Sequence, residues 1–349
     1  MNDYLEYQPS GPVLIVGGYG IVGTALTRLA APSWPLLLTG RNPQRGAQLA
    51  DEYNLEVRKW DLDDPTPFTA SVRAVISTVN DPGDRVLRAA VSAGIPYVDI
   101  TRWTSRLTRA VAQTSLLSPT APVLLSSAWM GGVVSIVAAS LAEDLGGLQQ
   151  IDVAIRYDTN DRAGADSVDF IDRLGQDFEI TENGHPHVLS PLSDTRWIDI
   201  AGYRTKVARL DTPEQLTFPM TLGATSAATR IGFSSNASTT ALLVAKTMGL
   251  FRWGSGERWR GLRRSLLYSP GTGGTAHIRI DVHGAHGSRT AHISDPAGQA
   301  HLTALGGLLG LQNVLDPKAQ PGVGFPESTT SLTEALAELK RHGVTILNS

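Results

Sequence analysis

The stretch Val13–Gly23, with the sequence VLIVGGYGIVG, decides the fold of the first part of this chain. Its four leading apolar residues predict a buried strand, and the glycines then lead into a helix expected over Ile21–Leu29. Gly18, Gly20 and Gly23 satisfy the pattern G-x-G-x-x-G between that strand and that helix. In this setting Gly18 permits a tight turn, Gly20 lets the backbone approach a pyrophosphate, and Gly23 lets helix and strand pack closely. The stretch therefore predicts a dinucleotide site at the N-terminus of the helix.

Strands and helices alternate over the first 130 residues. Strands are expected at Val13–Val16, Leu36–Thr39, Glu56–Trp60, Ala74–Thr78, Tyr97–Ile100 and Val123–Ser126. Helices are expected at Ile21–Leu29, Pro43–Tyr53, Asp84–Ala93 and Ser105–Thr114. This alternation is typical of an α/β protein with a doubly wound parallel (Rossmann) sheet. Ligands of such sheets bind at the carboxyl ends of the strands.

The pattern changes after about Ile151. Thr275–His283 and Arg289–Ser294 alternate apolar and polar residues on either side of a glycine turn, which predicts a hairpin. We therefore expect a second α+β domain that contains a mainly antiparallel sheet. A helix is expected from His301 through Leu315, and a last helix over Ser331–Arg341.

Composition excludes several classes of function. The chain has 349 residues, enough for two domains, with a formal net charge of −3 and no cysteine. So small a net charge gives no field that attracts nucleic acid. The lack of cysteine excludes disulfides, thiolate nucleophiles and cysteine-ligated metals, and no metal site is expected.

One uncharged run, Pro122–Leu141, is long enough to be considered as a membrane span. Its glycines and serines favour a short strand, a glycine turn and a helix instead. We expect no membrane contact and a cytoplasmic location.

The end of the second strand indicates which nicotinamide cofactor the site prefers. An acidic residue there binds the ribose 2′-hydroxyl of NAD(H), whereas an arginine accommodates the 2′-phosphate of NADP(H). The segment Thr39–Pro43, TGRNP, has no carboxylate, and Arg41 carries a guanidinium suited to a phosphate. The alternative is that Arg41 and Arg45 form a solvated surface pair. We predict NADP(H) as the cofactor.

Other residues are expected to contact the same cofactor. Asp61, after the third strand, can accept a hydrogen bond from the adenine amino group, or can be a solvated loop acid. Asn80 ends the fourth strand on the nicotinamide side, where a turn-forming role is the alternative. The remaining candidates fill the glycine stretch and the end of the second strand: Tyr19, Ile21, Val22 and Asn42.

The glycines also fit G-x-x-G-x-x-G through Gly17, Gly20 and Gly23, the spacing of short-chain dehydrogenases. That family needs a tyrosine followed four residues later by lysine, and none of the eight tyrosines meets this requirement. The glycine spacing alone is therefore insufficient to place the chain in that family.

The chain resembles the saccharopine dehydrogenase-like NADP-dependent oxidoreductases over nearly its whole length. The motifs that carry the resemblance occur in the family's order: GGYGIVG from Gly17, TGRN from Thr39, AGIPYVDIT from Ala93, WMGG from Trp129, TA from Thr303 and PGVGFPE from Pro321. One departure is that the family's Gly-x-x-Pro-Gly is here AWMGG, residues 128–132.

The resemblance implies an NADPH-dependent oxidoreductase that reduces a C=N bond, by imine reduction or by reductive amination of an amine or amino acid with a carbonyl. It implies that residues 1–133 form the dinucleotide-binding domain and that the C-terminal helices of 301–349 return to it. Residues 134–300 are then a substrate and dimerisation domain. The expected partners are a small-molecule amine, amino-acid or imine substrate and a second copy of the chain, as a homodimer.

Such a reaction requires the active site to stabilise an iminium cation, which a carboxylate or an aromatic face can do. Asp99, at the carboxyl end of a predicted strand, is a candidate, with capping of the following segment as the alternative. Trp103 and Trp129 are candidate pocket walls, or buried core residues. Tyr203 and Lys206 are a candidate proton donor and carboxylate anchor, with an edge-strand surface as the alternative. The catalytic residues predicted are Asp99, Trp129, Tyr203 and Lys206.

Two further segments, residues 158–173 and 251–264, concentrate charged side chains that are candidate substrate contacts. A solvated face is the alternative for both.

Two other functions fit the same sequence. One is an NADPH-dependent reductase of C=C or C=O bonds on the same fold. The other is a non-catalytic NADP(H)-binding sensor or scaffold, against which the large second domain argues.

Overall fold

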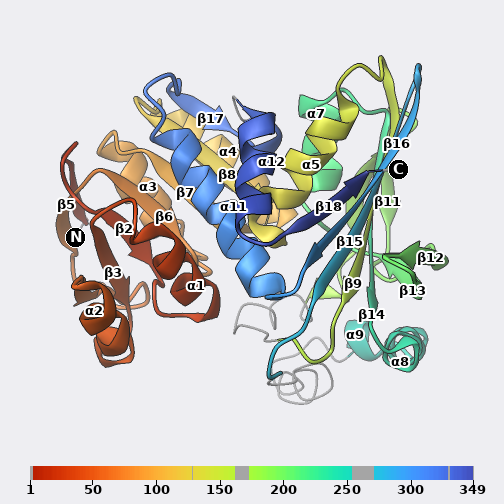
Figure 1. The fold of residues 1–349 in the computed structure, drawn as a ribbon, viewed down its shortest axis with the longest axis horizontal. Helices are drawn as coiled ribbons and strands as arrows, with labels where there is room; N and C mark the ends of the chain where they lie inside the picture. The colour runs from red at the N-terminus through yellow and green to blue at the C-terminus, as the bar shows by residue number, and fades with distance from the viewer. Residues whose placement is uncertain (1–2, 128, 162–172, 254–270, 329–330, 349) are drawn as a thin grey trace. The chain divides into compact units, whose positions relative to one another are not determined.

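The computed structural model describes residues 3–127, 129–161, 173–253, 271–328 and 331–348. The chain forms two compact units, residues 1–133 with 303–330 and residues 134–302 with 331–349. Each unit is built around a seven-stranded sheet (Figure 1). One sheet is parallel and the other is mixed, so the expected α/β fold class is confirmed.

The first unit contains parallel strands in the order β17-β8-β7-β6-β2-β3-β4. Their bounds are β2 (Val13–Val16), β3 (Leu36–Gly40), β4 (Glu56–Lys59), β6 (Ala74–Ser77), β7 (Tyr97–Arg102), β8 (Pro122–Ser127) and β17 (Gly322–Gly324). All six strands expected from the sequence are present, in the 3-2-1-4-5-6 order of dinucleotide-binding sheets. The seventh, β17, comes from late in the chain and pairs with β8.

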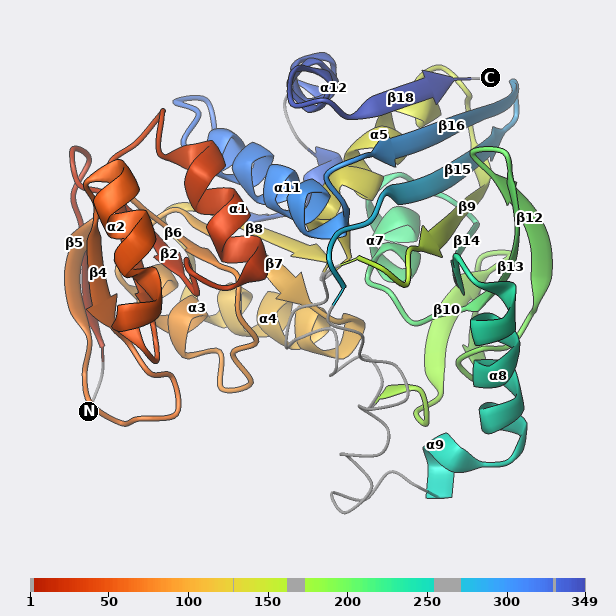
Figure 2. The same cartoon turned by 60° about the horizontal axis from the view of Figure 1, so that its bottom comes forward.

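Helices cover both faces of this sheet. Figure 2 shows α1 (Ile21–Ala30) and α11 (Gln299–Val314) on one face, and α3 (Arg85–Ser92) and α4 (Thr104–Leu117) on the other. A Cβ at Gly307 of α11 would lie 3.2 Å from Ile76 on β6 and 3.5 Å from Leu26 on α1. A short 3-10 turn, η1 (Pro43–Gly46), precedes α2 (Ala47–Tyr53) after β3. The predicted crossover helices are therefore all present, with small differences at their ends.

The turn from β2 into α1 begins at Gly17, whose φ of 85° lies in the left-handed region. The sequence pattern assigns this turn to Gly18, but Gly18 has no positive φ. Gly18 instead allows close packing, because a Cβ there would lie 2.7 Å from Leu38 of β3. A Cβ on Gly17 would lie 2.2 Å from Val79, two residues after the end of β6. Because neither Gly17 nor Gly18 has a side chain, the turn after β2 can pass between Leu38 of β3 and Val79 after β6.

Gly20 and Gly23 complete the turn in the way the pattern predicts. Gly20 is the exposed N-cap of α1, with φ −72° and ψ 179°, and it has no side chain to cap the helix. A Cβ on Gly23 would lie 2.0 Å from the Gly17 carbonyl oxygen, so the helix approaches the end of β2 as closely as backbone allows. The N–H groups in the first turn of α1, which have no partner within the helix, therefore lie beside the end of β2.

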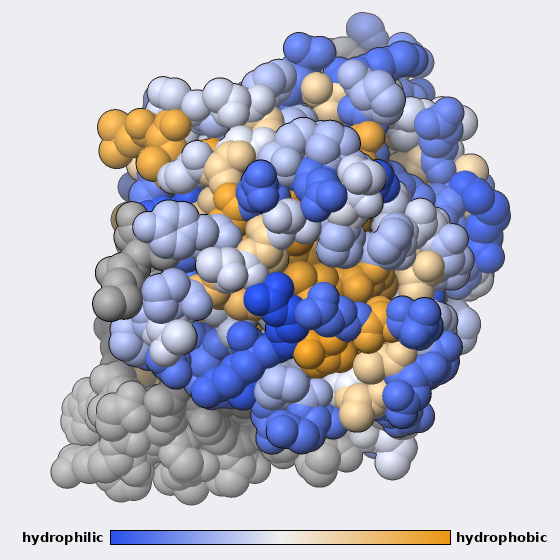
Figure 3. All heavy atoms as spheres, turned by 90° about the vertical axis from the view of Figure 1, so that its left-hand side faces the viewer, coloured by the Kyte–Doolittle hydropathy of each residue, from blue (hydrophilic) through white to orange (hydrophobic). Residues whose placement is uncertain are grey.

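A two-stranded parallel sheet, β1 (Tyr4–Tyr7) with β5 (Thr69–Val72), belongs to the same unit. The sequence analysis predicts neither strand. The side of the unit on which β5 lies is mostly hydrophilic, with apolar side chains gathered near the middle of the view in Figure 3.

The second unit contains a mixed sheet in the order β12-β13-β14-β9-β15-β16-β18. The strands are β9 (Leu148–Tyr157), β12 (Arg196–Ile200), β13 (Tyr203–Arg209), β14 (Ser226–Phe233), β15 (Ala276–Gly284), β16 (Gly287–Asp295) and β18 (Thr345–Asn348). β14 and β9 are parallel and the other neighbours are antiparallel, including the predicted β15–β16 hairpin. A separate hairpin joins β10 (Phe178–Glu182) to β11 (His185–Leu189).

Helices of this unit are α5 (Val133–Ala142), which starts at the unit boundary, α7 (Glu214–Thr221), α8 (Asn236–Thr247), α9 (Leu250–Trp253) and α12 (Leu332–Arg341). On β15 the alternate residues Ile278, Ile280 and Val282 have no exposed surface, so one face of the sheet carries the core. The run Pro122–Leu141 forms a strand, a short turn and a helix, as its glycines and serines predict. Among the described residues, no helix is both long and apolar enough to cross a membrane.

The C-terminal segment differs from the expectation that residues 301–349 return to the first unit. Residues 303–330 do so, but residues 331–349 belong to the second. The physical reason is that β18 completes the second sheet by antiparallel pairing with β16, from Ala291 with Asn348 to Ser294 with Thr345. The final helix α12, which precedes β18, goes with it.

Replacement of Gly23 by alanine tests the close approach of α1 to β2. We expect Gly23→Ala to lower the free energy of unfolding by about 2–3 kcal/mol, because the new methyl group must displace backbone. Gly20→Ala is the matched control, since its φ suits alanine and its Cβ would lie 3.3 Å from the nearest atom. Urea unfolding of both variants measures the difference, and equal stabilities would contradict the packing role.

Candidate functional site

The carboxyl ends of β2 and β6 form the point at which the strand order reverses. The chain runs outward from β2 through β3 to β4 on one side, and from β6 through β7 to β8 on the other. Thr78 ties the two strands together, because its N–H and hydroxyl both donate to the Val16 carbonyl oxygen, at 3.0 and 2.9 Å. A crevice at this position is where open α/β sheets bind their ligands. The glycine turn lies at the same place.

Tyr19 lies on the β3 side of the glycine turn. A Cβ on Gly40 would lie 2.4 Å from the Tyr19 hydroxyl oxygen, and one on Gly46 would lie 2.9 Å from its ring. Burial raises the pKa of the Tyr19 phenol, an effect that the nearby Arg45 and Arg41 guanidinium groups oppose. The two glycines therefore give the tyrosine room to lie beside both arginines.

Arg41, Asn42 and Arg45 are exposed at the carboxyl end of β3. No carboxylate occurs between Thr39 and Pro43. This end of the strand therefore offers cationic groups and backbone to a ligand, as the sequence predicts.

Asp61 and Asn80 lie at the ends of β4 and β6, both half-buried. The Asp61 carboxylate accepts a hydrogen bond from the Asp63 N–H at 3.2 Å, an arrangement typical of a loop acid. The Asn80 side-chain carbonyl accepts a hydrogen bond from Arg106 of α4, which also donates to the Asp81 carbonyl oxygen at 2.8 Å. The orientation of the Asn80 amide is thus set by an arginine from the helix layer.

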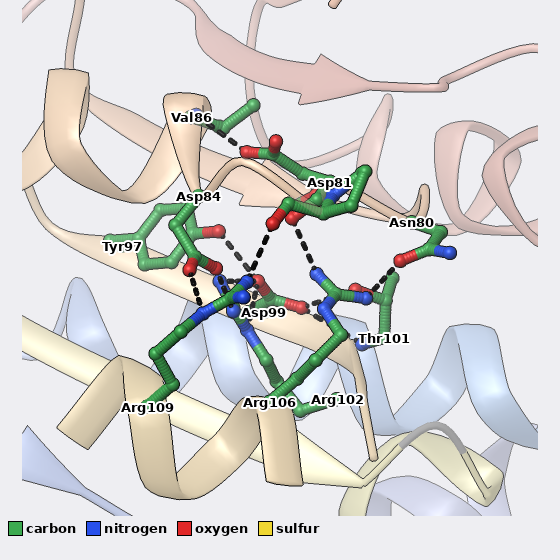
Figure 4. A network of polar contacts seen from close by, with 12 residues as sticks. Asn80, Asp81, Asp84, Val86, Tyr97, Asp99, Thr101, Arg102, Arg106 and Arg109 are labelled. Atoms are coloured by element: carbon green, nitrogen blue, oxygen red, sulfur yellow. Dashed lines mark hydrogen bonds and ion pairs between the residues drawn. The ribbon is translucent and has the colours of Figure 1, made fainter. Parts of the chain in front are cut away.

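Asp99 is fully buried on β7 and is surrounded by hydrogen-bond donors (Figure 4). One carboxylate oxygen accepts from the Thr101 N–H at 2.9 Å and the Thr101 hydroxyl at 2.7 Å. The other accepts from the Tyr97 hydroxyl at 2.7 Å and Arg102 Nε at 2.8 Å. Thr101 lies within β7, and α4 begins at Thr104 with Trp103 as its N-cap and no side-chain cap, so Asp99 does not cap that helix. Both carboxylate oxygens accept hydrogen bonds from protein groups, and the side chain is fully buried. Asp99 therefore holds neighbouring residues in position and does not face a substrate, as a direct catalytic role would require.

Arg102 links Asp99 to a second buried carboxylate. Its guanidinium forms ion pairs with Asp99 and with Asp84, and both partners are as completely buried as Arg102 itself. The other oxygen of Asp84 accepts from Nε of the partly exposed Arg109 at 2.6 Å. Figure 4 shows these groups between β7 and the layer of α3 and α4. The network fastens the strand to both helices.

The charges of this network are tuned by opposing effects. Burial would raise the pKa of Asp99, but Arg102, Arg106 and the hydrogen bonds from Thr101 and Tyr97 outweigh it and lower that pKa. Burial raises the pKa of Asp81, whose carboxylate accepts from the Val86 N–H at 2.8 Å. Burial also lowers the pKa of the Arg106 guanidinium. Asp99 is therefore ionised at neutral pH, as the charge of Arg102 requires.

The sequence analysis missed this network, although the sequence carries a signal for it. Arg106 and Arg109 lie three residues apart, the spacing of one face of the helix expected over Ser105–Thr114, and Arg102 precedes that helix. Asp81 and Asp84 precede the neighbouring helix at the same interval of three.

A turn with three successive positive φ angles follows β8. Met130, Gly131 and Gly132 have φ of 55°, 56° and 96°. A Cβ on Gly131 would lie 2.4 Å from the Thr303 carbonyl oxygen, and one on Gly132 would lie 2.4 Å from Pro326. Both glycines are therefore required where the family that the chain resembles has Pro-Gly.

Trp129 precedes this turn and is half-buried. Its indole meets that of Trp103 edge to face, with ring centroids 6.0 Å apart. The backbone N–H of Trp129 donates to the Ser127 hydroxyl at 3.0 Å. Trp103 is only 6% exposed, so it is a core residue, whereas Trp129 keeps part of its ring accessible. Of the two candidate pocket walls, Trp129 is the one that can reach a ligand.

Tyr203 and Lys206 lie on β13 of the second unit, near its edge strand β12. Tyr203 is 49% exposed, and the Arg156 guanidinium lies 4.1 Å from its ring centroid. The His277 ring is 5.4 Å away, and its pKa is lowered by burial and by Arg156. The Lys206 N–H donates to the Asn236 side chain at 3.0 Å. Tyr203 therefore lies in a cluster with Arg156 of β9 and His277 of β15, two other strands of the same sheet.

Parts of the two charged segments lie outside the described residues, namely 162–172 and 254–264. In the described parts, no three His, Asp or Glu side chains are placed so that they could hold a metal ion.

A surface cavity of about 370 Å³ lies at the opposite, amino ends of β3 and β4. It is lined by residues 31–36 and 53–56. Because ligands of such sheets bind at the carboxyl ends, this cavity is not the dinucleotide site.

No protein-family model matches the chain. No curated protein sequence matches it either.

Solved structures, in contrast, share its fold. Apo histidine-tagged saccharopine dehydrogenase (L-Glu forming) from Saccharomyces cerevisiae matches with a TM-score of 0.68 and 13% identity, over 97% of this chain and 99% of that one. Myo-inositol dehydrogenase from Corynebacterium glutamicum matches with a TM-score of 0.45 and 12% identity, over 99% of each chain. Biliverdin reductase from Synechocystis sp. PCC 6803, in complex with biliverdin and NADP+, matches with a TM-score of 0.40 and 12% identity, over 95% of this chain and 96% of that one. At these identities the likeness to the yeast enzyme is one of fold.

Replacement of Asp99 by asparagine tests the network. We expect Asp99→Asn to lower the free energy of unfolding by about 3–5 kcal/mol, because Arg102 then keeps a buried charge with one partner removed. Asp63→Asn, the same change at an exposed position of the same unit, should alter stability by less than about 0.5 kcal/mol. Denaturant unfolding at pH 7 measures both.

The pH dependence of the free energy of unfolding tests whether Asp99 acts through its negative charge. Since folding lowers the pKa of Asp99, its contribution is complete above the pKa of an unfolded aspartate, about 3.9. The contribution is lost as the pH falls through the lower, folded pKa. The loss of stability on acidification should therefore be smaller in Asp99→Asn than in the wild type; identical profiles would argue against the ion pair.

Proposed function

We propose that this protein is an NADP(H)-dependent oxidoreductase. The observation that carries the proposal is a glycine turn at the reversal point of a 3-2-1-4-5-6 parallel sheet, with Arg41 and Arg45 exposed after the adjacent strand. The turn and the uncapped N-terminus of α1 suit a pyrophosphate. The arginines suit a 2′-phosphate and replace the acid that an NAD(H) site would use.

Each part of the cofactor has a chemically suitable group at this end of the sheet. First-turn N–H groups of Ile21, Val22 and Gly23 would bind the pyrophosphate, and Arg41 the 2′-phosphate, with Tyr19 beside it. On either side, Asp61 is proposed to bind the adenine amino group and Asn80 the nicotinamide half. When bound, NADPH supplies a hydride to an electrophilic carbon of the substrate.

We further propose that the substrate is an imine or iminium, formed from an amine or amino acid and a carbonyl. The ordered motifs shared with saccharopine dehydrogenase-like enzymes support this, as does a common fold with the yeast saccharopine dehydrogenase over almost the whole chain. The chain must hold the iminium carbon near the hydride donor and exclude water. The accessible face of Trp129 is proposed to stabilise the cation.

The remaining candidates have different proposed tasks. Asp99 acts through its network, because Arg106 holds the Asn80 side chain. Tyr203 and Lys206 are proposed as the proton donor and the anchor for a substrate carboxylate.

The test of this function is NADPH oxidation by the purified protein with a panel of amines, 2-oxo acids and cyclic imines. The expected result is oxidation that requires both the amine and the carbonyl, or a preformed imine. Oxidation with the carbonyl or an enone alone would indicate reduction of C=O or C=C instead. Tight NADPH binding without turnover on any substrate would favour a sensor.

Replacement of Arg41 tests the choice of cofactor. We expect Arg41→Ala to raise the Kd for NADPH about tenfold to a hundredfold, because a charge-assisted bond to the 2′-phosphate is lost. The Kd for NADH should change by less than about twofold. Arg28→Ala is the matched control, since Arg28 is an exposed arginine of the same unit, paired with Glu52 at 3.5 Å. Fluorescence titration with both cofactors decides; equal weakening of both would contradict the assignment.

A further inference from the structure

One arginine of helix α3 holds the connection between β4 and β5, residues 60–68, here called the 60–68 loop. Arg85 Nη1 donates to the carbonyl oxygens of Asp61 at 3.2 Å and Leu62 at 3.4 Å. It also donates to that of Asp64, while Nη2 donates to that of Thr66 at 2.7 Å. Four carbonyl groups of one loop thus converge on a single guanidinium.

Asp3, the residue before β1, fixes the guanidinium from the other side. The Asp3 carboxylate accepts from Arg85 Nε at 2.6 Å and Nη2 at 2.7 Å, and also from the Phe68 N–H at 2.8 Å. The Asp3 and Arg85 side chains are only 5% and 16% exposed. Burial would raise the pKa of Asp3, but its bonds to Arg85 and Phe68 lower it, so the pair is ionic. Asp3 therefore connects the N-terminal segment both to Arg85 and to Phe68 at the end of the loop.

The 60–68 loop also adjoins the end of β3. The Trp60 N–H donates to the Gly40 carbonyl oxygen at 3.1 Å, and the Trp60 and Phe68 rings stack with centroids 4.5 Å apart. Tyr19 lies against the same strand end, since a Cβ on Gly40 would lie 2.4 Å from its hydroxyl oxygen. The loop is thereby tied to the residues proposed to receive the adenosine half of the cofactor.

We propose that Asp3 and Arg85 are positioning residues for the adenosine half of NADP(H), acting through the 60–68 loop. This inference rests on the proposed function. Neither residue needs to touch the cofactor, because Arg85 fixes the backbone of Asp61 and Asp3 fixes Arg85. A loop held in its binding conformation costs the ligand less ordering entropy.

The geometry requires arginine at position 85. Its planar guanidinium has five N–H donors, enough to meet a carboxylate in bidentate fashion and still reach several carbonyl groups. A lysine ammonium has three donors around one atom and cannot span both sets.

The test uses the full chain and three probes: NADPH, adenosine 2′,5′-bisphosphate and reduced nicotinamide mononucleotide. In Asp3→Asn we expect the Kd for NADPH and for the bisphosphate to rise about tenfold, as a charge-assisted contact is lost. The Kd for the mononucleotide and kcat at saturating NADPH should stay unchanged.

Glu6→Gln is the matched control. It is the same acid-to-amide change on β1, where Glu6 accepts a hydrogen bond from the Ser71 hydroxyl at 2.9 Å. All three affinities should equal those of the wild type. Asp3→Glu keeps the carboxylate and should recover part of the affinity that Asp3→Asn loses.

Equal affinities in Asp3→Asn and Glu6→Gln would overturn the inference, and so would equal weakening of all three probes, which would indicate a general structural defect. If Asp3→Asn does not fold, Arg85→Lys is measured in the same way, and the same selective loss is expected. A wild-type protein that binds none of the probes would refute the proposed function itself, rather than the role of Asp3 alone.

Discussion

The guanidinium of Arg102 has no exposed surface, and its charge is stable in the core of the first unit because Asp99 and Asp84 lie against it. A buried ion without its partners is costly, so the positions of β7 and of the start of α3 are coupled. The coupling extends further, since Arg106, in the first turn of α4, holds Asn80 after the end of β6. These buried ion pairs thus help to fix the carboxyl ends of β6 and β7, where a ligand is expected.

The two sides of the strand reversal are stabilised by different means. On the β3 side, backbone and glycines determine the shape: Gly17 and Gly23 bring α1 onto β2, and Gly40 makes room for Tyr19. On the β6 side, ion pairs between buried side chains do so. Steric constraints act over one or two ångströms and are visible in a local motif. Ion pairs join residues from several elements and depend on the complete fold.

This difference explains how much could be predicted from the sequence. The strands and crossover helices of the first unit follow from apolar runs and glycine punctuation, which are local signals. The same pattern cannot tell which glycine carries the positive φ, so the turn was assigned to Gly18 rather than Gly17. The link from Asp99 through Arg102 to Asp84 could not be predicted either, because Asp84 lies in the segment before α3 and meets Arg102 of β7 only in the complete fold. Likewise β18 has little local signal, and its partner β16 lies far back in the chain.

The path of the chain between the two units has a consequence for synthesis. The chain crosses from one unit to the other after residues 133, 302 and 330, and the strand that pairs with β16 is β18. Until residues 345–348 have left the ribosome, β16 is an edge strand with unpaired backbone groups. The second sheet therefore has a period of exposure during translation, in which the nascent chain is most open to pairing with other chains.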